Sequence, residues 1–155
     1  MEANNEATAQ VPSAVVLRRA FAVAPEKVWR AWTDPQALVQ WFGGGDPAKV
    51  LAVDMHLHVG GQFRILFVAP NGEEAEASGV YQEVEPYHRL VFSWAWRGTP
   101  ERVSRITLAI ERKPEGSELV FTHDRFFDEA ASQRHQQGWE FMFKHLDAWL
   151  APQKG

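Results

Sequence analysis

The stretch QQGWEFMFKHLDAWL, residues 136–150, decides the fold because its pattern predicts a long amphipathic helix near the end of the chain. On a helical wheel its large apolar side chains fall within about 120°, a stripe broad enough to cover a sheet. Lys144, Asp147 and Ala148 face the other way, and Phe141 lies outside the stripe. The stripe consists of Trp139, Met142, Phe143, Leu146, Trp149 and Leu150.

The chain before this helix predicts the sheet that the helix covers. Apolar and polar residues alternate with the period of two that is typical of half-buried strands. The pattern is clearest in HRLVFSWAW, where Phe92, Trp94 and Trp96 share one face with Leu90. Short turns such as PNGEE join consecutive strands, which therefore pair antiparallel. The predicted strands are residues 15–23, 49–59, 62–68, 76–86, 88–96, 102–113 and 118–126.

Two short helices are predicted after the first strand. The segment at 24–35 begins with Pro25, which suits a first helical turn, and ends at the pair Asp34-Pro35. The segment at 36–42 predicts a second short helix, which stops at three consecutive glycines. The predicted order is one strand, two short helices, about six consecutive strands and a long helix, which is an α+β fold.

The composition indicates one globular domain. The 155 residues are 45% hydrophobic and 23% charged, with no cysteine and a formal net charge of −4. Because the chain has no excess of basic residues, we expect no nucleic-acid partner. No apolar run approaches the roughly 18 residues that a membrane helix needs. The polar N-terminus lacks the pattern of a signal peptide, so we expect a cytoplasmic protein. We expect a disordered tail at 1–13, one domain at 14–151 and a short tail at 152–155.

Five separated segments resemble one known family. They are FAVAPEKVWRAWTDPQALVQWFG, HVGGQF, GVYQEVEPYHRLVFSW, GSELVFTHDRF and GWEFMFKHLDAWL, in this order. They are similar to the AHSA-type branch of the START/SRPBCC superfamily, whose members resemble activators of the heat-shock protein ninety ATPase. The superfamily also includes the birch-pollen allergen fold, polyketide cyclases and lipid-transfer START domains. The resemblance covers residues 14–151.

The resemblance implies the helix-grip fold, in which a curved seven-stranded antiparallel sheet wraps around the long C-terminal helix. It also implies a deep cavity for an apolar small molecule. The family commonly has an arginine where this chain has His58, so an ion pair of that arginine is either absent here or sensitive to pH. The residues that match family motifs are Trp41, Phe42, Gly60, Gly61, Pro86, Thr122, His123, Gly138 and Trp139.

The predicted binding site lies between the sheet and the helix. Ligand sites are concave and mostly apolar, with a few polar groups that set orientation. The polar candidates at inward positions are Tyr81, Glu83, His123 and His135. The alternative is that the aromatic rings fill a solid core and bind nothing. The ligand-binding residues that we predict are Trp32, Trp41, Phe63, Ile65, Tyr81, Phe92, Trp94, His123, Trp139, Met142 and Phe143.

The sequence assigns no catalytic, cofactor or metal residue. Asp54, His56 and His58 alternate along one strand, but polar strand faces are usually solvated, so we expect no metal site. GGGDPAK lacks the ending of a phosphate-binding loop, and the chain has neither a cysteine nor a nucleophile-elbow serine. Acid–base chemistry stays open, with His123 and either Glu83 or Tyr81 as proton carriers.

Three functions are therefore compatible with the sequence. The first is binding of an apolar or aromatic small molecule, such as a lipid, polyketide or polyphenol-like compound, in an internal cavity. The second is a cyclase or hydrolase that acts on such a ligand. The third is a domain that regulates a chaperone ATPase in the stress response, by analogy with the namesake activator. We favour the first, in a monomer or weak dimer without a cofactor, and keep a chaperone as an alternative partner.

Overall fold

The computed structural model describes residues 11–151, and its elements follow the predicted order. Most of the predicted tails, residues 1–10 and 152–155, lie outside the described residues. Ser13 is described, and its backbone hydrogen-bonds to Glu129 and Ser132 at the start of the last helix. The elements are β1 (Val15–Phe21), α2 (Pro25–Thr33), α3 (Pro35–Leu38), the 3₁₀ turn η1 (Pro47–Lys49), β2 (Val50–Met55), β3 (Gln62–Val68), β4 (Glu74–Glu85), β5 (Arg89–Trp96), β6 (Ser104–Lys113), β7 (Gly116–Asp124) and α4 (Glu129–Leu150).

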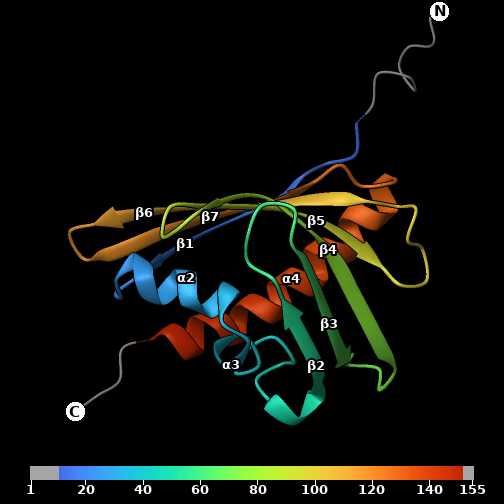
Figure 1. Ribbon diagram of the computed structural model, residues 1–155, viewed down its shortest axis with the longest axis horizontal. Helices are drawn as coiled ribbons and strands as arrows, with labels where there is room; N and C mark the ends of the chain where they lie inside the picture. Colours follow the sequence, from blue (N-terminus) through green and yellow to red (C-terminus); the bar gives the residue numbers. More distant parts are fainter. Residues whose placement is uncertain (1–10, 152–155) are drawn as a thin grey trace, which may run out of the picture.

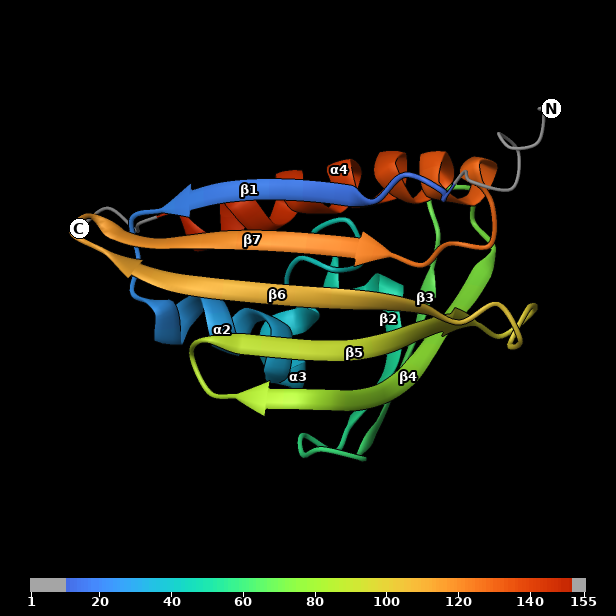
Figure 2. The ribbon, with the colours of Figure 1, turned by 90° about the horizontal axis from the view of Figure 1, so that it is seen from above.

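The strands form one seven-stranded antiparallel sheet in the order β1-β7-β6-β5-β4-β3-β2. The sheet bends strongly, and α4 lies diagonally across its concave side together with α2 and α3 (Figure 1). Seen from above, β1, β7, β6 and β5 lie side by side (Figure 2). The predicted α+β helix-grip fold is confirmed.

A bulge in β4 changes which side chains face the helix. Tyr81 pairs with Phe92 and Glu83 pairs with Val91, so the partner strand advances by one residue while β4 advances by two. Such a bulge bends the strand and disrupts the alternation of side chains. The prediction that Glu83 faces inward is therefore wrong, because its side chain is exposed and accepts a hydrogen bond of 2.8 Å from Nε of Arg89.

The last helix begins earlier than the stretch that predicts it. Asp128 caps it, because the carboxylate accepts a hydrogen bond from the backbone N–H of Ala131 at 2.8 Å. The predicted stripe faces the sheet: four of its side chains are buried, whereas Met142 and Trp149 are half-buried. Arg19 on β1 and Asp147 on α4 form an ion pair of 3.0 Å at the edge of the sheet. The four buried residues are Trp139, Phe143, Leu146 and Leu150.

The second short helix is shorter than predicted. It ends at Leu38, and the chain continues in turns, with the N–H of Trp41 bonding to the carbonyl of Leu38, three residues back. Trp41 is still fully buried, and its indole N–H donates to the carbonyl of Ala31 on α2 at 3.0 Å. The 3₁₀-type hydrogen bond, which spans three residues, continues the chain beyond the end of the helix. Trp41 is therefore held in the core although the helix itself ends at Leu38.

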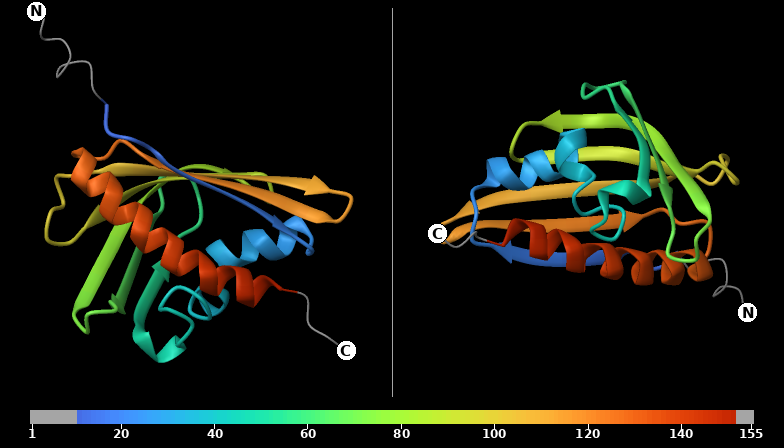
Figure 3. Two further views of the ribbon diagram at one scale, coloured as in Figure 1. Left: turned by 180° about the vertical axis from the view of Figure 1, so that it is seen from behind. Right: turned by 90° about the horizontal axis from the view of Figure 1, so that it is seen from below.

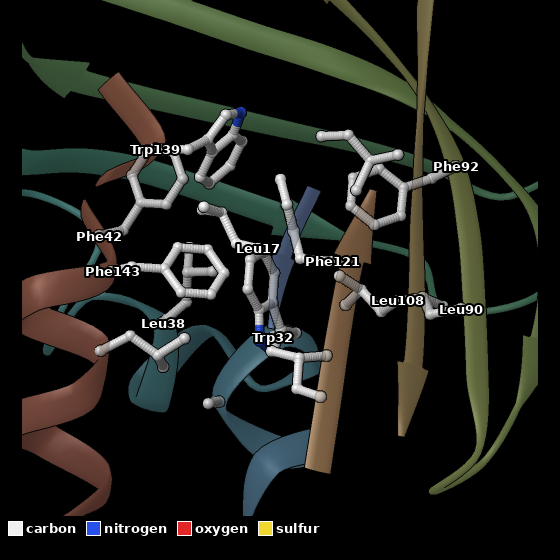
Figure 4. Packing of buried hydrophobic residues seen from close by; sticks show 14 of the residues in the cluster. Leu17, Trp32, Leu38, Phe42, Leu90, Phe92, Leu108, Phe121, Trp139 and Phe143 are labelled. Atoms are coloured by element: carbon white, nitrogen blue, oxygen red, sulfur yellow. The ribbon is translucent and has the colours of Figure 1, made fainter. Parts of the chain in front are cut away.

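Side chains from α2, β7 and the middle of α4 meet in the core (Figure 4). The ring centroids of Phe121 and Trp139 are 4.7 Å apart, and those of Phe121 and Phe143 are 5.2 Å apart. Trp32 from α2 packs within 6.0 Å of Trp139 and Phe143. These distances are typical of direct ring contact, so this part of the sheet–helix interface is solid.

Candidate functional site

A pocket of about 630 Å³ lies between the first half of α4 and the end of the sheet formed by β3, β4 and β5. Figure 3 shows these elements from behind and from below, with α4 in orange to red and the β3–β4 hairpin in green. Arg134, Gln137 and Phe141 line the pocket and are exposed, so it is a groove open to solvent. Its volume lies within the range of roughly 300–1,000 Å³ that is usual for small-molecule sites.

The walls of the pocket are mostly aromatic. From α4, the groove is lined by Trp139, Phe141 and Met142. The remaining aromatic lining residues come from the sheet and from the turn after α3: Phe42, Phe67, Trp94 and Trp96. Flat rings give a ligand large contact areas with few rotatable bonds to order, which suits apolar and aromatic guests.

Small residues keep the pocket open. Ala69, Pro70 and Ala75 line it from the β3–β4 hairpin, and Gly138 lines it from α4. An ideal Cβ at Gly138 would have no neighbour within 4 Å, so the space beside this glycine is empty. A side chain of ordinary size at these positions would occupy the groove.

The centre of the sheet–helix interface contains a much smaller void, of about 20 Å³. This volume is close to that of a single water molecule. Two buried indole N–H groups, on Trp32 and Trp94, have no acceptor among the described residues, and both side chains line this void. The usable space therefore lies in the groove beside the helix and not at the centre.

The structure divides the eleven predicted site residues into three sets. Trp94, Trp139 and Met142 line the open pocket. Trp41 and Phe143 are fully buried outside both spaces, as is His123. The others surround the small central void: Trp32, Phe63, Ile65, Tyr81 and Phe92, with Trp94 and Trp139 shared between the two spaces.

His123 is a fully buried hydrogen-bonding residue. Its Nδ1 accepts from the indole N–H of Trp139 at 3.1 Å, so its proton lies on Nε2 and is donated to Oγ of Ser104 at 2.7 Å. Ser104 in turn donates to the carbonyl of Trp94 at 3.1 Å. Burial, followed by the neighbouring His135, lowers the pKa of the His123 imidazole to about 2. The ring is therefore neutral, and both of its nitrogens are already bonded.

His135, which lines the pocket, also accepts a hydrogen bond from a tryptophan indole. Its Nε2 accepts from the indole N–H of Trp96 at 2.9 Å, and its Nδ1 donates to the carbonyl of Ala131 at 2.7 Å. Burial lowers the pKa of His135, the Ala131 contact opposes this shift, and the positive charge of Arg134 lowers it further. Two indole–imidazole pairs thus fix Trp96 and Trp139, which both line the groove.

The suggested proton carriers do not converge. Tyr81 lies at the central void, where burial raises the pKa of its phenol to about 12, so it stays protonated. Glu83 is on the outer side of β4 and His123 lies behind the pocket wall. Asp54 pairs with Arg64 at 3.2 Å, and residues 11–151 contain no group of three or more His, Asp or Glu side chains placed to hold a metal ion.

Several pocket residues were not among those predicted from the sequence. Phe67, Trp96, Arg134 and Gln137 are examples, and so is Phe141, which lies outside the apolar stripe that the sequence predicts. Gly138, Phe141 and Met142 are three and four residues apart, so they lie on one side of α4. A glycine in mid-helix followed by an off-stripe aromatic residue is the signal that could have indicated this second contact face.

Comparison with known proteins places this geometry in context. Residues 22–151 match the model of the family described as activator of Hsp90 ATPase homolog 1-like protein. A comparison with curated proteins finds no match. In the described part of the chain, no helix is both long and apolar enough to cross a membrane.

Three solved structures are similar over most of the chain. Protein CV1439 from Chromobacterium violaceum is 26% identical with a TM-score of 0.78, over 92% of this chain and 100% of that chain. A protein from Rhodobacter sphaeroides is 28% identical with a TM-score of 0.73, over 91% and 96% of the two chains. CalU16 from Micromonospora echinospora is 27% identical with a TM-score of 0.68, over 90% and 76%.

Proposed function

Because the chain belongs to the family of activator of Hsp90 ATPase homolog 1-like proteins, we propose that it binds an apolar or aromatic small molecule in the groove between α4 and β3–β5. The ligand is of the lipid, polyketide or polyphenol class. The observation that carries the proposal is the pocket of about 630 Å³ with its aromatic walls.

The size and composition of the groove support this proposal energetically. A ligand that buries about 200 Å² of apolar surface against these rings gains about 5 kcal/mol before the entropy cost of association. Trp96 and Trp139 are held by His135 and His123, so two walls are already ordered in the free protein. A preorganised wall loses little side-chain entropy when the ligand binds.

The other two functions have no specific support in the described residues. The proton carriers suggested for a cyclase or hydrolase are separated by the sheet and by the pocket wall. A chaperone-regulating role rests on the family description alone. Binding is therefore the function that the geometry favours.

The test is to fill the groove without disturbing the core. In a Gly138→Leu variant, the new side chain should project into the empty space beside α4. We expect its affinity for Nile red, an uncharged aromatic probe, to fall at least tenfold, since the leucine excludes the guest. The measurement is a fluorescence titration, with a urea unfolding curve to show that the variant is folded.

Ala148→Leu is the matched control, because Ala148 is exposed on the same helix and does not line the pocket. This variant should bind Nile red as the wild type does. Equal affinity in the wild type and in Gly138→Leu would refute the proposal, as would a wild type that binds no Nile red.

A further inference from the structure

The lining of the groove carries a single formal charge. Of the described residues that line it, Arg134 alone is cationic and none is Asp or Glu. The Arg134 side chain is exposed, and it forms no ion pair or hydrogen bond within residues 11–151. This guanidinium therefore gives the groove a positive charge, although the protein as a whole carries a formal net charge of −4.

Polarity changes along the groove in one direction. The first helical residues that line it are Arg134, His135 and Gln137, and the later ones are Gly138, Trp139, Phe141 and Met142. At 1.5 Å per residue, positions 134 and 142 are separated by about 12 Å along α4. A guest that lies along the helix therefore meets polar groups at one end and rings over the rest of its length.

The polar end offers N–H donors and no negatively charged acceptor, because its lining holds Arg134 and the neutral Gln137 but no Asp or Glu. His135 has no free nitrogen, because Trp96 donates to one and Ala131 accepts from the other. Arg134 offers a planar fork of N–H donors, a geometry that matches the two oxygens of a carboxylate. Gln137 adds an amide that can donate beside it.

We propose that the natural occupant is an amphiphilic carboxylate, with its anionic group at Arg134 and its apolar body against Trp96, Trp139 and Phe141. This inference rests on the proposed function, since it specifies the ligand class of the same groove. Uncharged apolar molecules would bind by the rings alone, and a cationic amphiphile would be repelled by Arg134. The tail can be aliphatic or aromatic, because both fit rings of this kind.

Isothermal titration calorimetry at pH 7.5 with two matched pairs tests the proposal. Octanoate and octanol share an aliphatic tail, and 2-naphthaleneacetate and 2-naphthaleneethanol share an aromatic one. Wild type and two variants, Arg134→Gln and Arg18→Gln, are titrated with all four compounds. Arg18 is the matched control because it is an exposed arginine on β1 that does not line the groove.

We expect the wild type and Arg18→Gln to bind each acid roughly tenfold more tightly than its alcohol, which is the effect of one charge-assisted contact. Arg134→Gln should lose this preference and keep the affinity for the alcohols. The preference should also shrink at high salt, because an exposed charge is screened. The tighter of the two acids identifies the tail as aliphatic or aromatic.

The two proposals fail in different ways. If acids and alcohols bind the wild type equally, or if the preference for acids survives in Arg134→Gln, the carboxylate assignment is overturned while apolar binding stands. If the wild type binds neither the acids nor the alcohols, both proposals are overturned.

Discussion

The two halves of the sheet–helix interface contain the same kinds of aromatic residue, but one half is closed and the other is open to solvent. Where β7 and α2 face the middle of α4, the rings of Phe121, Trp139 and Phe143 contact one another directly. Where β3, β4 and β5 face the first half of α4, tryptophans and phenylalanines line a groove of about 630 Å³. One half is a solid core and the other is a groove open to solvent.

Small residues account for the difference. In the closed half, large rings from three elements meet at one place. In the open half, the lining includes Ala69, Ala75 and Gly138 as well as the aromatic residues, and the side chains of these three are too small to fill the space. Protein interiors normally pack as densely as organic crystals, so large rings that can reach one another close the space between them. Where small residues stand between the rings, the space stays open, and the same aromatic-rich interface forms a pocket.

The largest expected effect comes from opening the closed half. Phe143→Ala removes a fully buried ring that contacts Phe121 and Trp32, so it should lower the free energy of unfolding by about 3–5 kcal/mol. Urea unfolding monitored by tryptophan fluorescence measures the change.

Phe141→Ala is the comparison variant two residues earlier in the same helix. Phe141 is 39% exposed and lines the groove, so the free energy of unfolding should change by less than about 1 kcal/mol. Similar losses in the two variants would show that the halves are not energetically distinct.

An intermediate effect is expected from acidification, because the imidazole of His123 is buried and neutral in the folded protein. The folded-state pKa of about 2 lies below the value of about 6.5 in the unfolded chain, so the unfolded state binds more protons below pH 6.5. The stability contributed by the neutral ring is therefore complete above about pH 6.5 and falls as the pH falls towards 2. Between pH 7.5 and 5.5 we expect a loss of about 1.4 kcal/mol from this residue, and the lowered pKa of His135 acts in the same direction.

Denaturant unfolding at the two pH values tests this dependence. A His123→Phe variant should be less stable at pH 7.5, because Trp139 and Ser104 lose their partner. It should nevertheless show a smaller loss between pH 7.5 and 5.5 than the wild type. An unchanged pH dependence in this variant would rule out His123 as the titrating group.

The smallest expected effect comes from adding one methyl group to the open half. Gly138→Ala should raise the free energy of unfolding by about 0.5–1 kcal/mol, because alanine is favoured in helix interiors and its Cβ meets no atom within 4 Å. Gly79→Ala is the opposite control, since a Cβ there would collide with the carbonyl oxygen of Ser93 on β5. Thermal unfolding that shows Gly138→Ala to be destabilised would mean that the groove is not open at this position.

Local patterns were enough to predict the elements and which side chains face inward, but not that the centre of the sheet–helix interface holds only a void of about 20 Å³. The two-residue alternation in β5 placed Phe92 and Trp94 on the inner face, and the stripe on α4 placed Phe143 and Leu146 there. Where a local irregularity intervened, the prediction was wrong. The bulge in β4 turned Glu83 to the outside, and the turn after Leu38 replaced the last residues of the second helix.

The sequence by itself determined that an antiparallel sheet grips a C-terminal helix, because hydrophobic period and turn residues act between near neighbours in the chain. Only the tertiary structure decided where the space remains. The groove depends on Ala69 and Ala75 of one hairpin facing Gly138 of a helix more than sixty residues away. Such a juxtaposition is set by strand register and sheet curvature, which no local pattern encodes.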